Sequence, residues 1–131
     1  MEIMLYAILK VNSDELRIIE DFEPPLPLEE MQEIVGGYID ALSLVQLTPG
    51  RTITVWFNDE GKINGLPANF ALMDASRNLL DIVMGDVLFT ATDEVGETVG
   101  LTYEEIEWIE QHLDFDSGIL SPILVTKTLY I

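Results

Sequence analysis

Residues 28–44 read LEEMQEIVGGYIDALSL and place apolar side chains three and four positions apart. This spacing predicts a helix, because residues so separated share one face of an α-helix. The apolar face comprises Leu28, Met31, Ile34, Val35, Tyr38, Ile39 and Leu42. Glu29, Glu33 and Asp40 fall on the opposite side, so the helix should present an acidic stripe to water or to a partner.

Two glycines, Gly36 and Gly37, fall inside this helical pattern. Each costs a helix up to about 1 kcal/mol relative to alanine, so a close backbone approach should offset the loss. We expect an internal loop to make that approach, with a second subunit or a partner as the alternatives.

Strand patterns lie on both sides of the predicted helix. Asn12, Ser13 and Asp14 form a turn signal between two apolar runs, which predicts an opening hairpin. A later strand pattern is interrupted at Gly85 and Asp86, where a bulge or bend is expected. The predicted strands are residues 5–11, 16–22, 52–57, 82–92 and 123–131.

A second long helix is predicted from Thr102 to about Leu113. Thr102 and Glu105 have the spacing of a capping box, in which each side chain bonds the backbone N–H of the other residue. Ile106, Ile109 and Leu113 should face inward.

A short helix is predicted after Asn69, its candidate N-cap, through about Leu79. Strand pairs interleaved with single helices predict an α+β fold. We expect a mostly antiparallel sheet of about five strands, with two longer helices and one short helix packed on it. Residues 1–131 should form a single acidic domain.

The charge of the chain restricts its partners. The 131 residues include 24 Asp and Glu against 6 Lys and Arg, a formal net charge of -18. Such a chain repels nucleic acid and anionic lipid and attracts basic protein surfaces. With 48% hydrophobic residues, no Cys and no long apolar run, it predicts a folded cytoplasmic protein without direct nucleic-acid or membrane binding.

No motif predicts an enzyme, a cofactor or a metal. The single histidine, His112, is expected to be a helix-end imidazole rather than a catalytic base. The glycines fit no phosphate-binding loop. Carboxylate pairs are numerous, and some arise by chance among 24 acids, so a hydrolase that uses paired carboxylates stays open as a third class of function. Asp114 and Asp116 resemble the start of a calcium loop, but Val125 replaces the bidentate Glu, so an Asx-rich turn is expected and a weak divalent-cation site is the alternative.

The helix after Thr102 is the main candidate for a binding surface. Its outer side carries Glu104, Glu107 and Glu110 with Trp108 among them. Tryptophan concentrates interface energy and stacks on arginine, although Trp108 could instead cover a neighbouring loop. With Glu105 counted, the helix carries one carboxylate per ~2.6 Å, against one phosphate per ~1.7 Å of duplex DNA. A closer match requires both acidic helices to lie on one face.

Four segments resemble a known family: LEEMQEIVGGYID at 28–40, NDEGK at 58–62, LPAN at 66–69 and GDVL at 85–88. Over roughly residues 3–107 the chain resembles small acidic domains of uncharacterised function found on bacteriophages, plasmids and related mobile elements. The resemblance implies that genomic setting and supplies no catalytic residue. Acidic proteins of such elements often block host restriction or other DNA-binding defence enzymes by occupying their basic clefts.

The sequence therefore predicts a non-enzymatic acidic interaction protein that binds a cationic surface, with DNA mimicry against a host DNA-binding or defence enzyme as its specific form. The predicted binding residues are Glu29, Glu33, Gly36, Gly37, Asp40, Glu104, Glu107, Trp108 and Glu110. The alternative is a small oligomeric regulatory or housekeeping domain whose acids serve solubility, with Gly36 and Gly37 at a homodimer contact.

Overall fold

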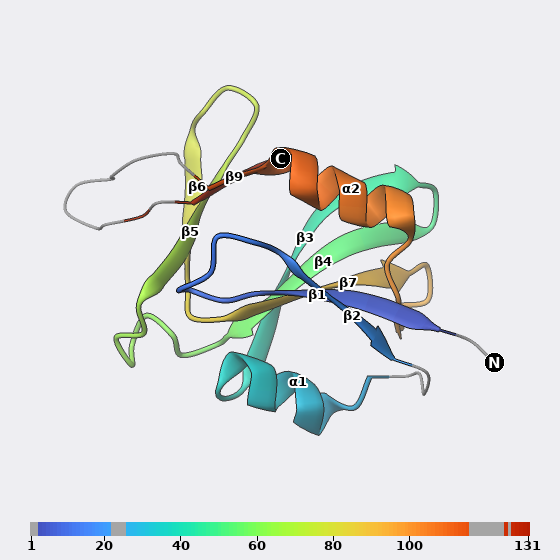
Figure 1. Cartoon of the computed structure of the whole chain (residues 1–131), viewed down its shortest axis with the longest axis horizontal. Helices are drawn as coiled ribbons and strands as arrows, with labels where there is room; N and C mark the ends of the chain where they lie inside the picture. The colour runs from blue at the N-terminus through green and yellow to red at the C-terminus, as the bar shows by residue number, and fades with distance from the viewer. Residues whose placement is uncertain (1–2, 22–25, 116–124, 126) are drawn as a thin grey trace.

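A computed structural model describes residues 3–21, 26–115, 125 and 127–131, in which strands dominate over helices (Figure 1). The strands are β1 (Met4–Leu9), β2 (Arg17–Asp21), β3 (Ile39–Thr48), β4 (Arg51–Asn58), β5 (Ala68–Met73), β6 (Leu79–Met84), β7 (Val87–Asp93), β8 (Thr98–Val99), β9 (Leu113–Asp114) and β10 (Thr128–Tyr130). The helices are α1 (Leu28–Val35) and α2 (Tyr103–His112).

The first sheet is antiparallel and runs in the order β2-β1-β7-β4-β3, with the short β8 added to β7. Two hairpins, β1–β2 and β3–β4, lie on either side of β7, which pairs with β1 and with β4. The outer strands of this path are therefore β2 and β3.

The second sheet runs in the order β6-β5-β10-β9. β5 and β6 form an antiparallel hairpin, and β10 adds to β5 in parallel. Lys127 fastens this returning strand, because its buried Nζ donates to the carbonyl oxygens of Lys10, Val11 and Ser13 at 2.8, 2.9 and 3.0 Å. Burial lowers the pKa of the Lys127 ammonium.

The first sheet has a hydrophobic core on each face. The main core lies between the first sheet, the second sheet and α2, and it includes Leu5, Ala7, Leu9, Ile53, Val55, Phe70, Phe89, Ile109 and Leu129. The smaller core lies under α1 and includes Met4, Tyr6, Leu26, Met31 and Leu88. Alternation along the strands sends successive side chains into different cores. The two helices consequently cover opposite faces of the first sheet (Figure 1).

The predicted architecture is wrong in its count and arrangement of elements. The described residues form two sheets instead of one, and they contain two helices instead of three. The antiparallel character holds for the first sheet, whereas β5 and β10 are parallel.

The helix predicted over residues 28–44 ends at Val35. Gly36 adopts a φ of 80°, and the N–H groups of Gly36 and Gly37 both donate to the carbonyl oxygen of Gln32, at 2.8 and 3.0 Å. A left-handed residue bonded in this way closes a helix. The chain then enters β3, because its later apolar residues fit a strand in the first sheet as well as they fit a helical face.

The short helix predicted after Asn69 is also wrong, because the β5–β6 hairpin occupies this region. Asn69 is buried, and its amide donates to the carbonyl oxygens of Leu9 and Gly85 at 2.9 and 2.8 Å. The hairpin turn is held by the Asp74 carboxylate, which accepts from Asn78 and from the Ser76 backbone. These bonds, with Asn78 the larger contributor, lower the pKa of Asp74.

Other predicted elements are confirmed. The opening hairpin forms as β1 and β2, and residues 52–57 lie within β4. The interruption at Gly85 and Asp86 is present, but it separates strands of different sheets, β6 and β7. Of the predicted last strand, the structure describes β10 and its neighbours Val125, Lys127 and Ile131.

Candidate functional site

The start of α2 is fixed by the predicted capping box. Thr102 Oγ1 accepts the Glu105 N–H at 3.2 Å, and the Glu105 carboxylate accepts the Thr102 N–H at 2.8 Å. The inward residues Ile106, Ile109 and Leu113 are buried, as the spacing predicts. α2 is therefore held in one rotation about its axis.

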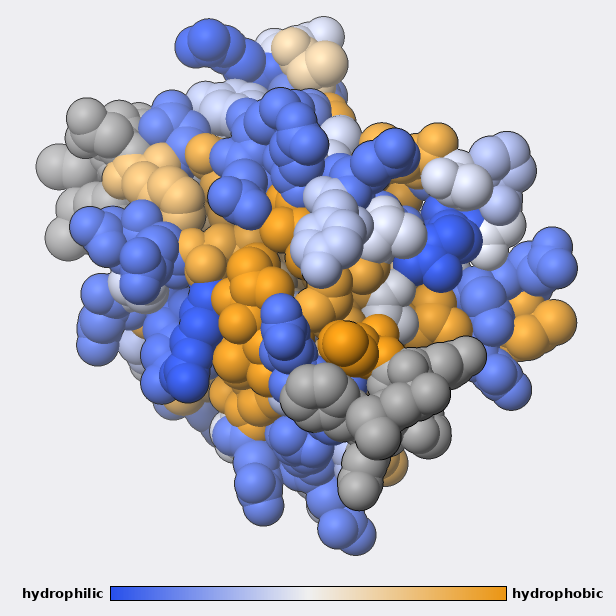
Figure 2. All heavy atoms as spheres, turned by 45° about the vertical axis from the view of Figure 1, so that its right-hand side comes forward, coloured by the Kyte–Doolittle hydropathy of each residue, from blue (hydrophilic) through white to orange (hydrophobic). Residues whose placement is uncertain are grey.

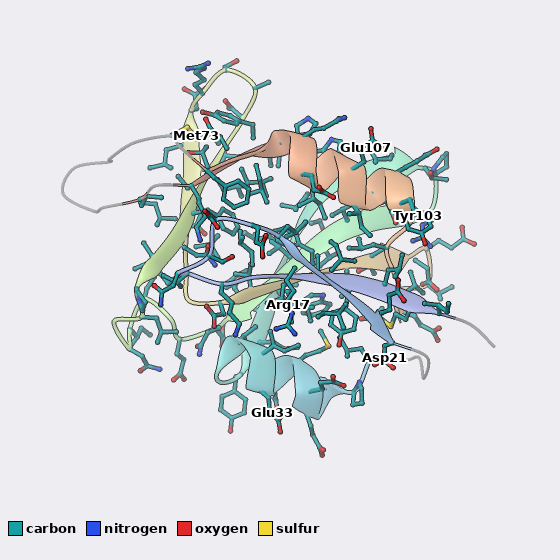
Figure 3. The ribbon with its side chains drawn as sticks, in the orientation of Figure 1. Arg17, Asp21, Glu33, Met73, Tyr103 and Glu107 are labelled. Atoms are coloured by element: carbon teal, nitrogen blue, oxygen red, sulfur yellow. The ribbon has the colours of Figure 1, made fainter. Side chains whose placement is uncertain are left out.

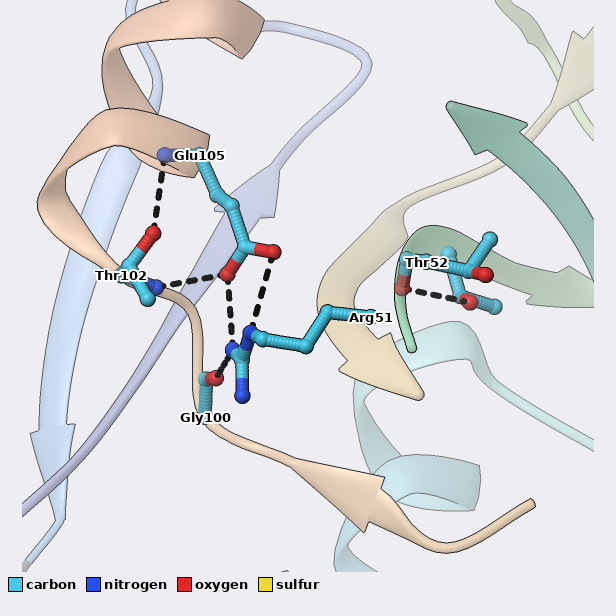
Figure 4. Close-up of polar contacts among 6 residues, drawn as sticks. Arg51, Thr52, Gly100, Thr102 and Glu105 are labelled. Carbon is cyan, nitrogen blue, oxygen red and sulfur yellow. Dashed lines mark hydrogen bonds and ion pairs between the residues drawn. The ribbon is translucent and has the colours of Figure 1, made fainter. Parts of the chain in front are cut away.

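Glu105 also forms a buried ion pair, which the sequence did not reveal. The Glu105 side chain is 1% exposed, and its Oε1 lies 2.8 Å from Arg51 Nη2 (Figure 4). The same nitrogen donates to the Gly100 carbonyl at 2.6 Å, while Arg51 Nε lies 3.4 Å from Glu105 Oε2. Arg51 on β4 thus ties the helix start to the first sheet.

This ion pair corrects the predicted charge density of α2. Glu105 faces inward, so the outer face carries only Glu104, Glu107 and Glu110, all exposed. Three carboxylates over the same seven residues, about 10.5 Å, give one charge per ~3.5 Å instead of ~2.6 Å. The helix alone therefore falls further below the density of DNA, one charge per ~1.7 Å.

Acids of the β7–β8 turn lie beside the start of α2. Glu94 and Glu97 are exposed in this turn, and β8 leads directly through Gly100 to the helix. The Glu94 side chain lies next to Gly50 in the β3–β4 turn, immediately before Arg51. Figure 1 shows both turns near the first turn of α2. We call the set Glu94, Glu97, Glu104, Glu107 and Glu110 the acidic surface.

Basic residues are scarce around the acidic surface. Arg51 on β4 is the Lys or Arg of the sequence that lies next to this surface, and its guanidinium is bonded inward to Glu105 and Gly100. The other five lie on or beside the β1–β2 turn, the β4–β5 connection, the β5–β6 turn and β10, as Lys10, Arg17, Lys62, Arg77 and Lys127. The acidic surface is therefore not neutralised by its own fold.

The sequence analysis gives two alternatives for Trp108, an outward anchor and a side chain that covers a neighbouring loop. The structure shows an arrangement intermediate between them. It is partly buried against the main core, and its ring stacks on His112 with 4.2 Å between centroids and 19° between planes. His112 Nδ1 lies 2.8 Å from the Trp108 carbonyl oxygen, which makes this nitrogen the donor. Trp108 also lines a shallow hollow of about 240 Å³ with Leu47, Glu104, Glu107 and Gln111. An indole edge thus remains accessible within the acidic surface.

The remaining predicted acids lie elsewhere. Glu29 and Glu33 are exposed on α1, and Asp40 is exposed on β3 instead of on a helix. Figure 3 places Glu33 and Glu107 on opposite sides of the first sheet. The two acidic helices therefore do not share a face, and the combined stripe that would match DNA is not formed.

Gly36 and Gly37 have an intramolecular explanation. Gly36 ends α1, and a Cβ added to Gly37 would lie 2.8 Å from Nδ2 of Asn58. This Asn58 nitrogen donates to the Val35 carbonyl at 3.3 Å. The close approach that the sequence analysis expects is thus internal to the chain, while a role of the glycines in partner binding stays a prediction.

The alternative cation site is only partly described. Asp114 is exposed in β9, whereas Asp116 lies outside the described residues. Within the ranges that the structure describes, no three Asp, Glu or His side chains lie close enough together to hold a metal ion.

A family model matches residues 4–114, which is most of the chain. The model is that of a domain of unknown function, DUF3846. The chain belongs to the DUF3846 family. This match confirms the resemblance to domains of uncharacterised function, while occurrence on phages and plasmids stays a prediction. No curated protein and no solved structure matches the chain.

Neither helix described for this DUF3846 domain has the length and apolar character needed to cross a bilayer.

The surface has an apolar hollow of about 370 Å³ between the β1–β2 hairpin and the start of α2, lined by Ile3, Leu5, Glu20, Leu101, Thr102 and Tyr103. Figure 2, turned toward the right-hand side of Figure 1, shows an apolar strip through the middle of this face, bordered by hydrophilic side chains. One carboxylate, Glu20, is present in the lining, which offers no pair of acid and base groups.

The DUF3846 domain also has a cleft that sequence reasoning missed. It measures about 270 Å³ and lies between β3 and β4 of the first sheet and β6 of the second. Its lining combines apolar residues with Asp40, Asp59, Lys62 and Asp81. The cleft exists because β6 pairs with β5. The sequence analysis predicts a helix after Asn69 through about Leu79, and no local pattern in the sequence indicates the strand pairing instead.

Proposed function

We propose that this DUF3846 domain is a non-enzymatic interaction protein whose acidic surface binds a cationic surface of another protein. The observation that supports it is the grouping of Glu94 and Glu97 with the α2 acids, while the neighbouring Arg51 on β4 is bonded inward. Two elements, the β7–β8 turn and α2, build this grouping, and the ion pair of Arg51 with Glu105 holds α2 on the first sheet.

Electrostatics favours this kind of partner. Exposed charges interact over about 8–10 Å at physiological ionic strength, so neighbouring unpaired carboxylates act on a partner together. A concentrated field of one sign raises the association rate of an oppositely charged protein and disfavours partners of like charge. The net charge of -18 adds a long-range term of the same sign.

The hollow at Trp108 supplies a place for a specific contact. Leu47 is 39% exposed at its edge, and Glu104 and Glu107 stand over it. A guanidinium placed there would lie against the accessible edge of the indole and pair with a carboxylate at the same time. An arginine of the partner is therefore the side chain that fits this hollow best.

DNA mimicry is the specific form of this proposal. A DNA-binding or defence enzyme has a phosphate-binding groove, and an acidic protein can occupy such a groove in place of DNA. Because α1 and α2 cover opposite faces, this form depends on the β7–β8 turn acting together with α2. Glu29 and Glu33 would not take part in the same contact.

The proposal is tested by coupling the protein to a resin and capturing proteins from a bacterial lysate. Proteins captured at low salt should be released as salt is raised, because the contact is electrostatic. Trp108→Ala should retain less of the same proteins, with circular dichroism used to show that the variant is folded. Retention that is the same at low and high salt would contradict the proposal.

A further inference from the structure

The cleft between the two sheets opens the main core to solvent. Leu42 of β3 and Phe57 of β4 line it and pack against the main core without being fully buried. Its volume of about 270 Å³ is below the roughly 300 Å³ at which sites for drug-sized ligands begin. The cleft therefore suits one long side chain better than a cofactor.

One wall of the cleft is an unpaired sheet edge. β6 pairs with β5 on one side, and among the residues that the structure describes no strand pairs with its other side. The register between β5 and β6 shifts near Leu80, whereas Asp81, Ile82 and Val83 keep a regular register. An edge of this kind presents backbone N–H and C=O groups to which an incoming strand can bond. At Ile82 the N–H donates to the Asp81 carboxylate at 2.8 Å, a bond that an added strand would replace.

Apolar side chains extend along the same edge. Leu79 and Leu80 are 49% and 51% exposed, and with Ile82 and Met84 they line a second, largely apolar hollow of about 480 Å³. Lys62 and Asp81 border both hollows. The two hollows are therefore adjacent along β6. A strand added to this edge could place some of its side chains in one hollow and others in the second, because its side chains alternate in direction.

The charges in the cleft indicate the sign of the charge that its occupant carries. The ammonium of Lys62 pairs with the carboxylate of Asp81. Asp40 and Asp59 take part in no ion pair among the described residues. A cation entering the cleft would therefore meet two carboxylates that lack a basic partner.

We propose that this cleft binds an extended basic segment of a partner protein. The segment adds to β6 as a strand, places a Lys or Arg side chain beside Asp40 and Asp59, and lays an apolar side chain on Leu79 and Leu80. The site is separate from the acidic surface, since it uses neither α2 nor Trp108, and it goes beyond the function proposed above.

A second copy of the chain is the competing occupant, and charge disfavours it. Each copy would bring a net charge of -18 and its own Asp40 and Asp59 to the contact. Like charges placed opposite each other across an interface weaken it.

The test is a titration of the full chain with a synthetic peptide of alternating lysine and valine at low salt, followed by backbone amide NMR. Amide shifts should concentrate on residues 81–84 and beside Asp40 and Asp59. A peptide of alternating glutamate and valine should cause no such shifts. A lysine–valine peptide with alternate backbone nitrogens methylated should lose the binding, because it cannot complete the strand ladder.

Two double variants separate this site from the acidic surface. Asp40→Asn with Asp59→Asn should weaken the lysine–valine peptide about tenfold, because two carboxylate contacts are removed. Glu104→Gln with Glu107→Gln removes the same charge from α2 and should leave the affinity measured from the shifts of residues 81–84 unchanged. Shifts confined to α2, equal effects of the methylated peptide on residues 81–84, or peptide-free shifts of β6 that grow with protein concentration would overturn the proposal.

Discussion

α1 and α2 carry similar acidic, amphipathic patterns, yet the protein holds them in different ways. α1 begins at Pro27 without a side-chain cap, ends at Gly36 and buries Met31 and Val35. α2 begins with a capping box whose Glu105 also pairs with Arg51 on β4. α1 is bonded to its neighbours only near the limit of hydrogen-bond length, by Asn58 Nδ2 on the Val35 carbonyl at 3.3 Å and by Tyr6 OH on Glu30 at 3.4 Å, whereas α2 has an ion pair at 2.8 Å.

This comparison bears on function because a fixed surface loses less conformational entropy on binding than a mobile one. The acids of α2 project from a helix whose rotation is set by Ile106 and Ile109 on one side and by Glu105 on another. Those of α1 project from a helix of eight residues that lies on the smaller core. The account therefore assigns binding to the α2 side, and the following changes test that difference.

The largest expected effect is on the anchor of α2. Arg51→Met should lower the free energy of unfolding by about 3–5 kcal/mol, because it leaves the Glu105 carboxylate buried without a counter-charge. Urea unfolding followed by circular dichroism measures this. Glu105→Gln removes the charge itself and should cost less than Arg51→Met. A loss under about 1 kcal/mol for Arg51→Met would show that the ion pair does not anchor the helix.

A smaller effect is expected at the end of α1. Gly36→Ala should cost about 1–2 kcal/mol in the same assay, because alanine is strained at a φ of 80°. Glu33→Ala, at an exposed position of the same helix, is the matched control and should change stability by less than about 0.5 kcal/mol. If the two variants unfold alike, Gly36 is not what ends the helix.

Substitution of the N-cap residue should lower the free energy of unfolding more at α2 than at α1, by about the value of one hydrogen bond. Thr102→Ala should cost about 1 kcal/mol, because it removes the acceptor for the Glu105 N–H. The equivalent residue of α1, Pro27, makes no side-chain cap bond, so Pro27→Ala should cost less. Equal losses in urea unfolding would remove this part of the contrast.

The smallest effect on stability near neutral pH is expected at Tyr6, which lies in the smaller core under α1. Burial, together with the charges of Glu30 and Asp21, raises the pKa of Tyr6 to about 12. The folded state therefore binds this proton more tightly than the unfolded state does, and the contribution of Tyr6 to stability is complete below pH 10.0 and is lost as the pH rises toward about 12.

Tyr6→Phe tests this assignment, because its stability should fall less steeply than that of the wild type between pH 10 and 12. Urea unfolding across this range, with phenolate absorbance recorded in parallel, gives both slopes. Parallel slopes for the two proteins would show that Tyr6 does not carry the shift.

Local patterns in the sequence predicted the elements that local physics decides. The capping box of Thr102 and Glu105, the alternation of β4 and the turn between β1 and β2 each depend on residues close together in the chain. They were confirmed for that reason. The outward position of Glu104, Glu107 and Glu110 followed directly from the helix period.

The failures have non-local causes. Gly36 and Gly37 fit the interior of a helical pattern, and the contact of Gly37 with Asn58 that accompanies the helix end comes from a later strand. Asn69 offered a cap signal, but its amide bonds Leu9 and Gly85, one of which is sixty residues away. For the candidate site, the pairing of Glu105 with Arg51 and the cleft beside β6 both depend on strand pairings that no single segment encodes.

The most direct measurement compares lysate capture by two variants that remove equal charge from the two helices. Glu104→Gln with Glu107→Gln alters the acidic surface, and Glu29→Gln with Glu33→Gln alters α1; all four side chains are exposed. We predict that proteins captured by the wild type at low salt are lost by the α2 variant and retained by the α1 variant. Equal capture by both variants would contradict the assignment of binding to the acidic surface.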